Sequence, residues 1–204
     1  MTGARVDELR SEAARAGRRL QYLTMAWNSA ECAVALAAGF VAGSVALVGF
    51  GFDSALEVTA SLAALWRLWR DADETRRDAA ERRAMRIIGV CFLLLAAYVL
   101  YDAVGALARG EAPDHSTVGM VLAVLSLIVM PLLVHFKRRI ATRLDSGALE
   151  AEARQTRVCA CLSAILLAGL ALNAGLGWWW ADPVAALGMV PLIAREGWDA
   201  VRAS

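Results

Sequence analysis

Two acidic residues, Asp53 and Glu57, stand one helical turn apart in a long apolar stretch of the 204-residue sequence. Residues four apart share one face of a helix, so both carboxylates point to the same side. The stretch 20–66 contains no Lys or Arg that could neutralise them. Two carboxylates on one face without a cationic partner are half of a binding site for a divalent cation. The alternative is a structural acid pair that hydrogen-bonds to neighbouring helices.

The depth of these acids favours the metal-binding interpretation. A lone carboxylate at the centre of a membrane helix costs about 2.5–3.5 kcal/mol on insertion scales, and such residues are functional by default. Asp53 follows Ser44 by nine residues, or about 14 Å of helix, which is near the middle of a hydrocarbon core about 30 Å thick. Asp102 lies toward the outer end of its own stretch, where Tyr101 and water can satisfy it, and we expect a structural role there.

Two further pairs of polar residues stand one turn apart. Asn28 and Glu31 lie in the first apolar stretch, where they line an access path for ions, accept protons or make a polar contact between helices. Gln155 and Cys159 lie at the start of a later stretch. A thiolate is a good ligand for a soft metal ion, whereas a neutral Gln oxygen is a weak one. From its surroundings alone Cys159 is a packing residue, because buried cysteines are common.

The positive charges are unevenly distributed, although the net charge is only +1. Four windows hold no Lys or Arg, at 20–66, 87–108, 110–136 and 158–194. The chain is 59% hydrophobic, above the roughly 45–50% of soluble domains, so these windows predict membrane helices. The balanced charge gives no reason to expect a nucleic acid as a partner.

A helix needs about 20 apolar residues to cross a bilayer, so the windows hold six spans. The expected spans are 21–42, 44–66, 87–108, a fourth from a cap at Asp114 or Ser116 to about Phe136, a fifth ending near Gly175, and a sixth opened by Asp182 as N-cap and Pro183. With both termini cytoplasmic, every Lys and Arg except Arg109 falls on the cytoplasmic side. We expect an all-α membrane protein with a cytoplasmic segment 1–20, a six-helix transmembrane domain 21–198 and a short tail 199–204.

Three motifs are similar to those of one family of membrane proteins. The second span contains Gly43-Ser44-Val45-Ala46-Leu47 and Phe52-Asp53-Ser54-Ala55-Leu56-Glu57, the basic stretch 137–157 contains Ser146, Ala148-Leu149 and Ala151-Glu152-Ala153, and a Trp-rich run at 177–183 opens the sixth span. Their order and the six-helix spacing resemble the cation diffusion facilitator family of zinc and other divalent-metal transporters, and its branch of vesicle zinc-efflux membrane proteins. The resemblance covers about residues 20–198.

The resemblance implies a metal site at mid-membrane, held by two residues four apart on the second helix and two on the fifth. These positions fall on Asp53 and Glu57 and, counting back from Ser163, on Gln155 and Cys159. The usual pair on the fifth helix is His and Asp, so this chain departs at both positions, and Gln155 takes up no proton. The resemblance makes Cys159 an expected metal ligand. We expect the family's cytoplasmic metal-binding domain and its His-rich loop to be absent.

The position of Gln155 leaves two arrangements open. Arg154 and Arg157 flank it, so the apolar window places Gln155 at the membrane edge. Either the fifth helix extends below the bilayer and lines an inward-facing vestibule, or the site is shallower on that side.

Together these patterns predict a secondary transporter rather than an enzyme, because the sequence offers no nucleophile–base constellation. The expected cargo is a divalent transition metal, Zn²⁺ first of all, exported from the cytoplasm in exchange for protons that pass through Asp53, Glu57 and Glu31. No cofactor is expected beyond the transported ion. The resemblance implies a homodimer, and the expected location is a bacterial inner (plasma) membrane. The alternative is a non-transporting accessory protein that binds metal or a partner on a degenerate transporter scaffold, because positions 155 and 159 are altered.

Overall fold

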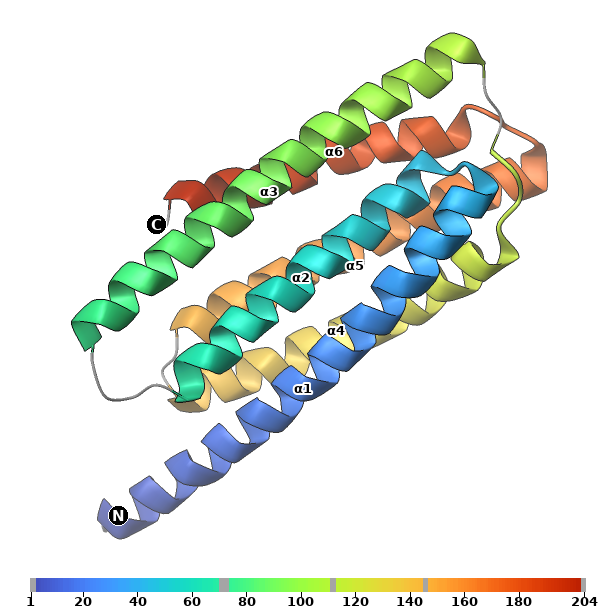
Figure 1. The fold of residues 1–204 in the computed structure, drawn as a ribbon. Coiled ribbons are helices and arrows are strands. Elements are labelled where there is room, and N and C mark those ends of the chain that lie inside the picture. Colours follow the sequence, from blue (N-terminus) through green and yellow to red (C-terminus); the bar gives the residue numbers. More distant parts are fainter. Residues whose placement is uncertain (1–2, 70–73, 111–112, 145–146, 203–204) are drawn as a thin grey trace.

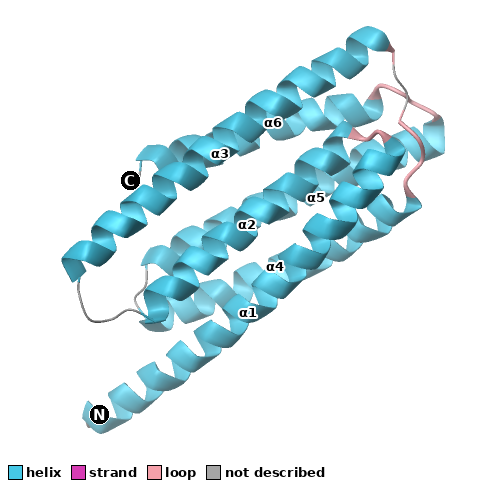
Figure 2. Cartoon of the chain, in the orientation of Figure 1, coloured by secondary structure: helices cyan, strands magenta, loops and turns pink. Residues whose placement is uncertain are grey.

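The chain folds into a bundle of long helices, coloured in Figure 1 from blue at the N-terminus to red at the C-terminus. The computed structural model describes residues 3–69, 74–110, 113–144 and 147–202. The helices are α1 (Gly3–Ala42), α2 (Val45–Trp69), α3 (Glu74–Arg109), α4 (Thr117–Leu144), α5 (Gly147–Leu176) and α6 (Ala181–Arg202). Within these ranges every regular element is a helix (Figure 2), so the all-α prediction is confirmed.

Five of the six helices are long and apolar enough to cross a membrane. The qualifying segments are Arg15–Ala42, Val45–Leu62, Met85–Arg109, Thr117–Arg143 and Glu152–Leu176. The sixth helix, α6, does not qualify, because Asp182 near its start and Arg195 and Glu196 in its second half leave too short an apolar stretch between them. The six predicted helices are therefore all present in the predicted order, and α1 to α5 have the composition of membrane spans.

Four helices, α1, α2, α4 and α5, form one group, which we call the four-helix group, and α3 pairs with α6 beside it (Figure 1). Within the group α1 packs on α2 and α4, and α4 packs on α5. The α3–α6 pair adjoins the group through α2 and α5. Both termini lie at one end of the bundle, the terminal end, and the turns that follow α1 and α5 lie at the other, the loop end. The predicted orientation, with the terminal end in the cytoplasm, stays a prediction.

Helices α4 and α5 continue well past the apolar windows. Because α4 runs to Leu144 and α5 begins at Gly147, the basic stretch 137–157 is almost entirely helical. Ser116 caps α4, since its Oγ accepts the N–H of Gly119 at 3.0 Å, which confirms one of the two predicted caps.

The carboxylate of Asp182 caps α2 rather than its own helix. Asp182 lies inside the first turn of α6, which begins at Ala181. Its Oδ1 accepts a hydrogen bond from Ser44 Oγ at 2.5 Å, and its Oδ2 accepts the N–H of Ala46 at 3.4 Å. A negative charge is favourable at a helix N-terminus, so this contact ties the start of α6 to the start of α2. The prediction that Asp182 is the N-cap of the sixth helix is therefore wrong.

Candidate metal site

Asp53 and Glu57 share one face of α2, as their spacing predicts, and that face is turned into the bundle. Their side chains are almost fully enclosed, with 6% of Asp53 and 1% of Glu57 exposed. Enclosed carboxylates have lost their water shell, and an uncompensated charge in such a place is costly. The neighbouring helices must therefore supply the partners of these two groups.

Cys159 of α5 lies beside both carboxylates. It is 2% exposed, and its thiol lies close enough to Asp53 and Glu57 to interact with both carboxylates electrostatically. The three side chains offer oxygen and sulfur ligands of the kind that bind Zn²⁺. They do not form a closed coordination shell, because no three His, Cys, Asp or Glu side chains of the described residues stand close enough together to hold a metal ion. Binding would require these side chains to draw together.

Gln155 lies one turn before Cys159 on α5 and is half-buried. Its amide Nε2 is buried and has no hydrogen-bond partner in the part of the chain that the structure describes. The apolar segment of α5 begins at Glu152, so Gln155 belongs to the spanning helix. This placement favours the first of the two arrangements, an extended fifth helix. The role of Gln155 as a ligand stays a prediction.

A lysine stands beside the acids of α2. Lys137 of α4 is fully buried, at 0% exposure, and its Nζ lies 4.0 Å from Glu57 Oε1. The same ammonium donates hydrogen bonds to Glu152 Oε1 at 3.1 Å and to Thr156 Oγ1 at 2.9 Å. The expectation that the acid pair lacks a cationic partner is therefore wrong for Glu57, because the partner comes from another helix.

The two acids that Lys137 contacts differ in how many of their carboxylate oxygens accept a hydrogen bond. Oε1 of Glu152 accepts the ammonium and Ser61 Oγ, the latter at 2.7 Å, and its Oε2 accepts the amide of Gln21. Oε1 of Glu57 accepts the hydroxyl of Thr156, while its Oε2 has no hydrogen-bond partner among the residues described. One oxygen of Glu57 thus stays available to a ligand, whereas Glu152 is fully engaged.

One feature of the helix register and one of the sequence single out Lys137. The buried residues of α4 recur on one helix face, and Lys137 continues this series: Gly119, Leu122, Ser126, Met130, Leu133, Lys137 and Ala141. Lys137 is also the only lysine in the chain, since every other cationic residue is an arginine. Windows without Lys or Arg miss both features, because they group Lys137 with Arg138 and Arg139, which are exposed.

Asn28 and Glu31 face the interior from α1, with 0% and 1% exposed. Ser54 of α2 donates to Glu31 Oε2 at 2.8 Å. Glu31 Oε1 and both polar atoms of Asn28 lack a hydrogen-bond partner within the described ranges. Unpaired buried polar atoms are rare unless they meet water or an ion. The structure thus places both residues in the interior that holds Asp53 and Glu57, and their part in a proton or ion path stays a prediction.

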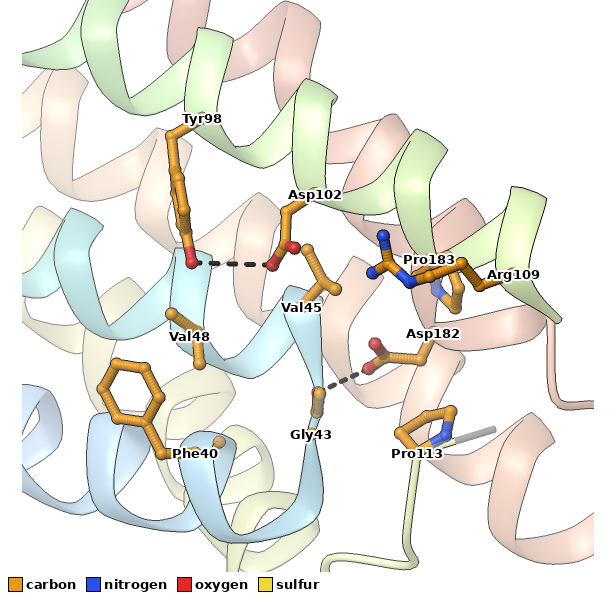
Figure 3. A pocket seen from close by; sticks show the side chains of 13 residues that line it. Phe40, Gly43, Val45, Val48, Tyr98, Asp102, Arg109, Pro113, Asp182 and Pro183 are labelled. Carbon is orange, nitrogen blue, oxygen red and sulfur yellow. Dashed lines mark hydrogen bonds between the residues drawn. The ribbon is translucent and has the colours of Figure 1, made fainter. Parts of the chain in front are cut away.

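A separate pocket of about 430 Å³ opens at the loop end (Figure 3) and contains none of the predicted site residues. Asp102 and Asp182 both line it, and each is held by a neighbour. Tyr98 donates to Asp102 at 3.5 Å, whereas Tyr101 is 80% exposed, so Tyr98 supplies the contact expected of Tyr101. The structural role expected for Asp102 fits this geometry.

Comparison with known proteins gives the family. Residues 22–204 match the cation efflux transmembrane domain. The chain is 25% identical over 182 residues to an uncharacterized transporter from Synechocystis, an alignment that covers 86% of this chain and 59% of that protein. It is 28% identical over 172 residues to the magnetosome protein MamB from Paramagnetospirillum magneticum, covering 81% and 58% of the two chains. It is 27% identical over 121 residues to the cation-efflux pump FieF from Shewanella oneidensis, covering 59% and 39%.

The chain therefore spans between 39% and 59% of the length of these relatives. The match to the transmembrane domain, in contrast, extends over almost the whole chain. It coincides with a helical bundle that encloses Asp53 and Glu57 of α2 and Cys159 of α5. The chain belongs to the cation efflux family of integral membrane transporters.

Proposed function

We propose that this protein exports a divalent transition-metal ion, Zn²⁺ first of all, from the cytoplasm, and binds it between Asp53 and Glu57 of α2 and Cys159 of α5. The observation that carries the proposal is the enclosure of two carboxylates and a thiol side by side in a membrane bundle. Carboxylate oxygen and thiolate sulfur suit Zn²⁺, and Cd²⁺, Fe²⁺ and Mn²⁺ are its competitors. Gln155, one turn away, is the fourth candidate ligand.

Proton exchange fits the same chemistry. Carboxylic acids and thiols must lose their protons to bind a metal, so binding releases protons and protonation releases the metal. Gln155 cannot take part in this exchange, because an amide does not titrate. The remaining carriers are Asp53 and Glu57, with Glu31 as the nearest acid on α1. Rocking of helix pairs against one another would then expose the site to each side in turn.

The assembly and the location are part of the proposal. We expect a homodimer in a bacterial inner (plasma) membrane, with the termini in the cytoplasm. Support for the membrane side comes from the charges, because every Lys and Arg except Arg109 belongs to the segments assigned to the cytoplasm. Support for the dimer comes from the resemblance to the family.

The test is transport by the purified full chain in liposomes that enclose a zinc-sensitive dye, under a pH gradient. Asp53→Ala and Glu57→Ala should abolish the zinc-dependent signal, because each removes a ligand and a proton carrier. Asp102→Ala is the matched control, since this acid lies on α3 in the loop-end pocket, and it should transport like the wild type. Equal signals from the wild type and the two α2 variants would refute transport through this site.

A second candidate function is metal binding without transport, as in an accessory protein. Two observations favour it: Lys137 already engages Glu57, and the described side chains form no closed metal cluster. The liposome experiment separates the two functions when it is combined with calorimetry. Zinc binding that depends on Asp53 without any zinc uptake would support the accessory function.

A further inference from the structure

Lys137 carries a positive charge and lies buried beside the carboxylates that are proposed to bind a metal ion. Its side chain is fully enclosed, and among the described residues its polar contacts are Glu152 Oε1, Thr156 Oγ1 and Glu57 Oε1. A buried ammonium is costly unless it is paired, so these contacts explain why it can stay charged. They do not explain why the chain keeps its only lysine at this place.

The contacts of Lys137 are unequal in a way that suggests movement between two acids. Its Nζ lies 3.1 Å from Glu152 Oε1 but 4.0 Å from Glu57 Oε1. Thr156 bridges the two sides, since its hydroxyl accepts from Lys137 and donates to Glu57. Lysine carries a compact charge on a flexible stem, which suits a small displacement better than the planar group of arginine. The ammonium can therefore withdraw from Glu57 and keep its pairing with Glu152.

We propose that Lys137 is a tethered counter-cation of the transport site, which neutralises Glu57 when no metal is bound and withdraws to Glu152 when a divalent ion binds Glu57. This inference rests on the proposed function of Asp53 and Glu57. Its physical basis is that a metal ion on Glu57 and an ammonium about 4 Å from the same carboxylate repel each other strongly in a medium of low dielectric constant. Glu152 supplies the alternative partner, so the ammonium stays paired with a carboxylate when it withdraws.

The proposal predicts effects of opposite sign for two related variants. In Glu152→Gln, Lys137 loses its better partner and pairs with Glu57 alone, so Zn²⁺ meets stronger competition. In the double variant Lys137→Met with Glu152→Gln, both charges of the outer pair are removed together, so Glu57 is left free for the metal. A purely structural role of the ion pair predicts that both variants weaken binding.

The experiment is calorimetric titration of Zn²⁺ into the detergent-purified full chain. Glu152→Gln should bind Zn²⁺ about tenfold more weakly than the wild type, and the double variant about tenfold more tightly. Arg138→Met is the matched control, because Arg138 is the exposed neighbour of Lys137, and its affinity should equal that of the wild type. Zn²⁺ binding by the double variant, with none measurable in the wild type, would also support the proposal.

Two outcomes would overturn the proposal and are distinguishable from each other. Tight binding that depends on Asp53, with the double variant no tighter than the wild type, overturns the role of Lys137 and leaves the proposed function intact. Absence of binding in every variant, the double variant included, overturns both.

A second measurement covers the case in which the double variant does not fold. Since the chain has one lysine, ¹⁵N-labelled lysine gives a single side-chain ammonium signal in the wild type. Saturating Zn²⁺ should shift this signal in the wild type and leave it unchanged in Asp53→Asn. An unmoved signal in a wild-type protein that binds Zn²⁺ would refute the withdrawal of Lys137.

Discussion

The four-helix group differs from the α3–α6 pair in enclosing ionisable side chains, although both regions contain close glycine contacts, as where a Cβ on Gly39 would lie 2.9 Å from Val48 N. Where α3 meets α6 the backbones leave no room for a side chain, since a Cβ on Gly89 would lie 2.7 Å from Gly197 O, and one on Gly197 would lie 2.8 Å from Gly89 O. The interior of the four-helix group instead encloses ionisable side chains: Glu31, Asp53, Glu57, Lys137, Glu152 and Cys159.

This difference separates what stabilises the bundle from what gives it a function. Between membrane helices, close van der Waals packing of small residues is a main source of association. Enclosed charges cost free energy, and replacing them by apolar groups is often neutral or stabilising. We therefore expect glycine substitutions in the α3–α6 pair to lower stability, and substitutions of the proposed ligands in the four-helix group to lower metal affinity.

The largest effect is expected from Cys159→Ser. Even residues that only support a ligand cost about 10–100-fold in metal affinity when they are replaced, so loss of the thiolate should weaken Zn²⁺ binding by about a hundredfold. Titration calorimetry measures the affinity, and the thermal unfolding temperature should stay within a few degrees of the wild type. Cys161→Ser is the control, because Cys161 is exposed on the same helix and should bind as the wild type does. An unchanged affinity in Cys159→Ser would make Cys159 a packing residue.

The second largest effect is expected from Gly197→Ala, and it concerns the stability of the bundle instead of its metal affinity. The new Cβ would lie 2.8 Å from Gly89 O and 2.9 Å from Phe92 Cβ, so α3 and α6 must separate. Overpacking of this kind costs about 2 kcal/mol, which thermal unfolding in detergent would detect. Gly188→Ala on the same helix is the control, since its Cβ would meet only Ile165, at 3.7 Å. A loss of Zn²⁺ affinity in folded Gly197→Ala, with stability unchanged, would contradict the proposed division between the two regions.

The same division explains which features could be predicted from the sequence. Apolar windows and the rule for residues four apart are local properties, and they are sufficient to place the helices and to assign Asp53 and Glu57 to one face. Burial of the Asp53 pair followed from its depth in an apolar stretch. The contact between Asp182 and Ser44 could not follow from local rules, because it joins residues 138 apart in the chain.

The contact between Lys137 and Glu57 shows why part of the site could not be predicted from the sequence. Windows defined by an absence of Lys and Arg place every cationic residue outside the membrane, including one whose helical register turns it inward. The pairing also requires α4 to lie beside α5, so that Lys137 meets Glu152 and Thr156. Neither fact is visible in a single apolar window.

The smallest effect is expected from Gln155→His, which adds a ligand where the four-helix group now offers an unpaired amide. An imidazole nitrogen binds Zn²⁺ well, so affinity should rise about tenfold, and the gain should be present only where the imidazole is neutral. An unperturbed histidine titrates near pH 6.5, so the gain should hold above about pH 7 and disappear toward pH 5.5. Calorimetry across this range measures it, with Arg154→His, an exposed neighbour, as the control. Equal affinities for the two histidine variants would place position 155 outside the site and leave Asp53, Glu57 and Cys159 as the proposed ligands.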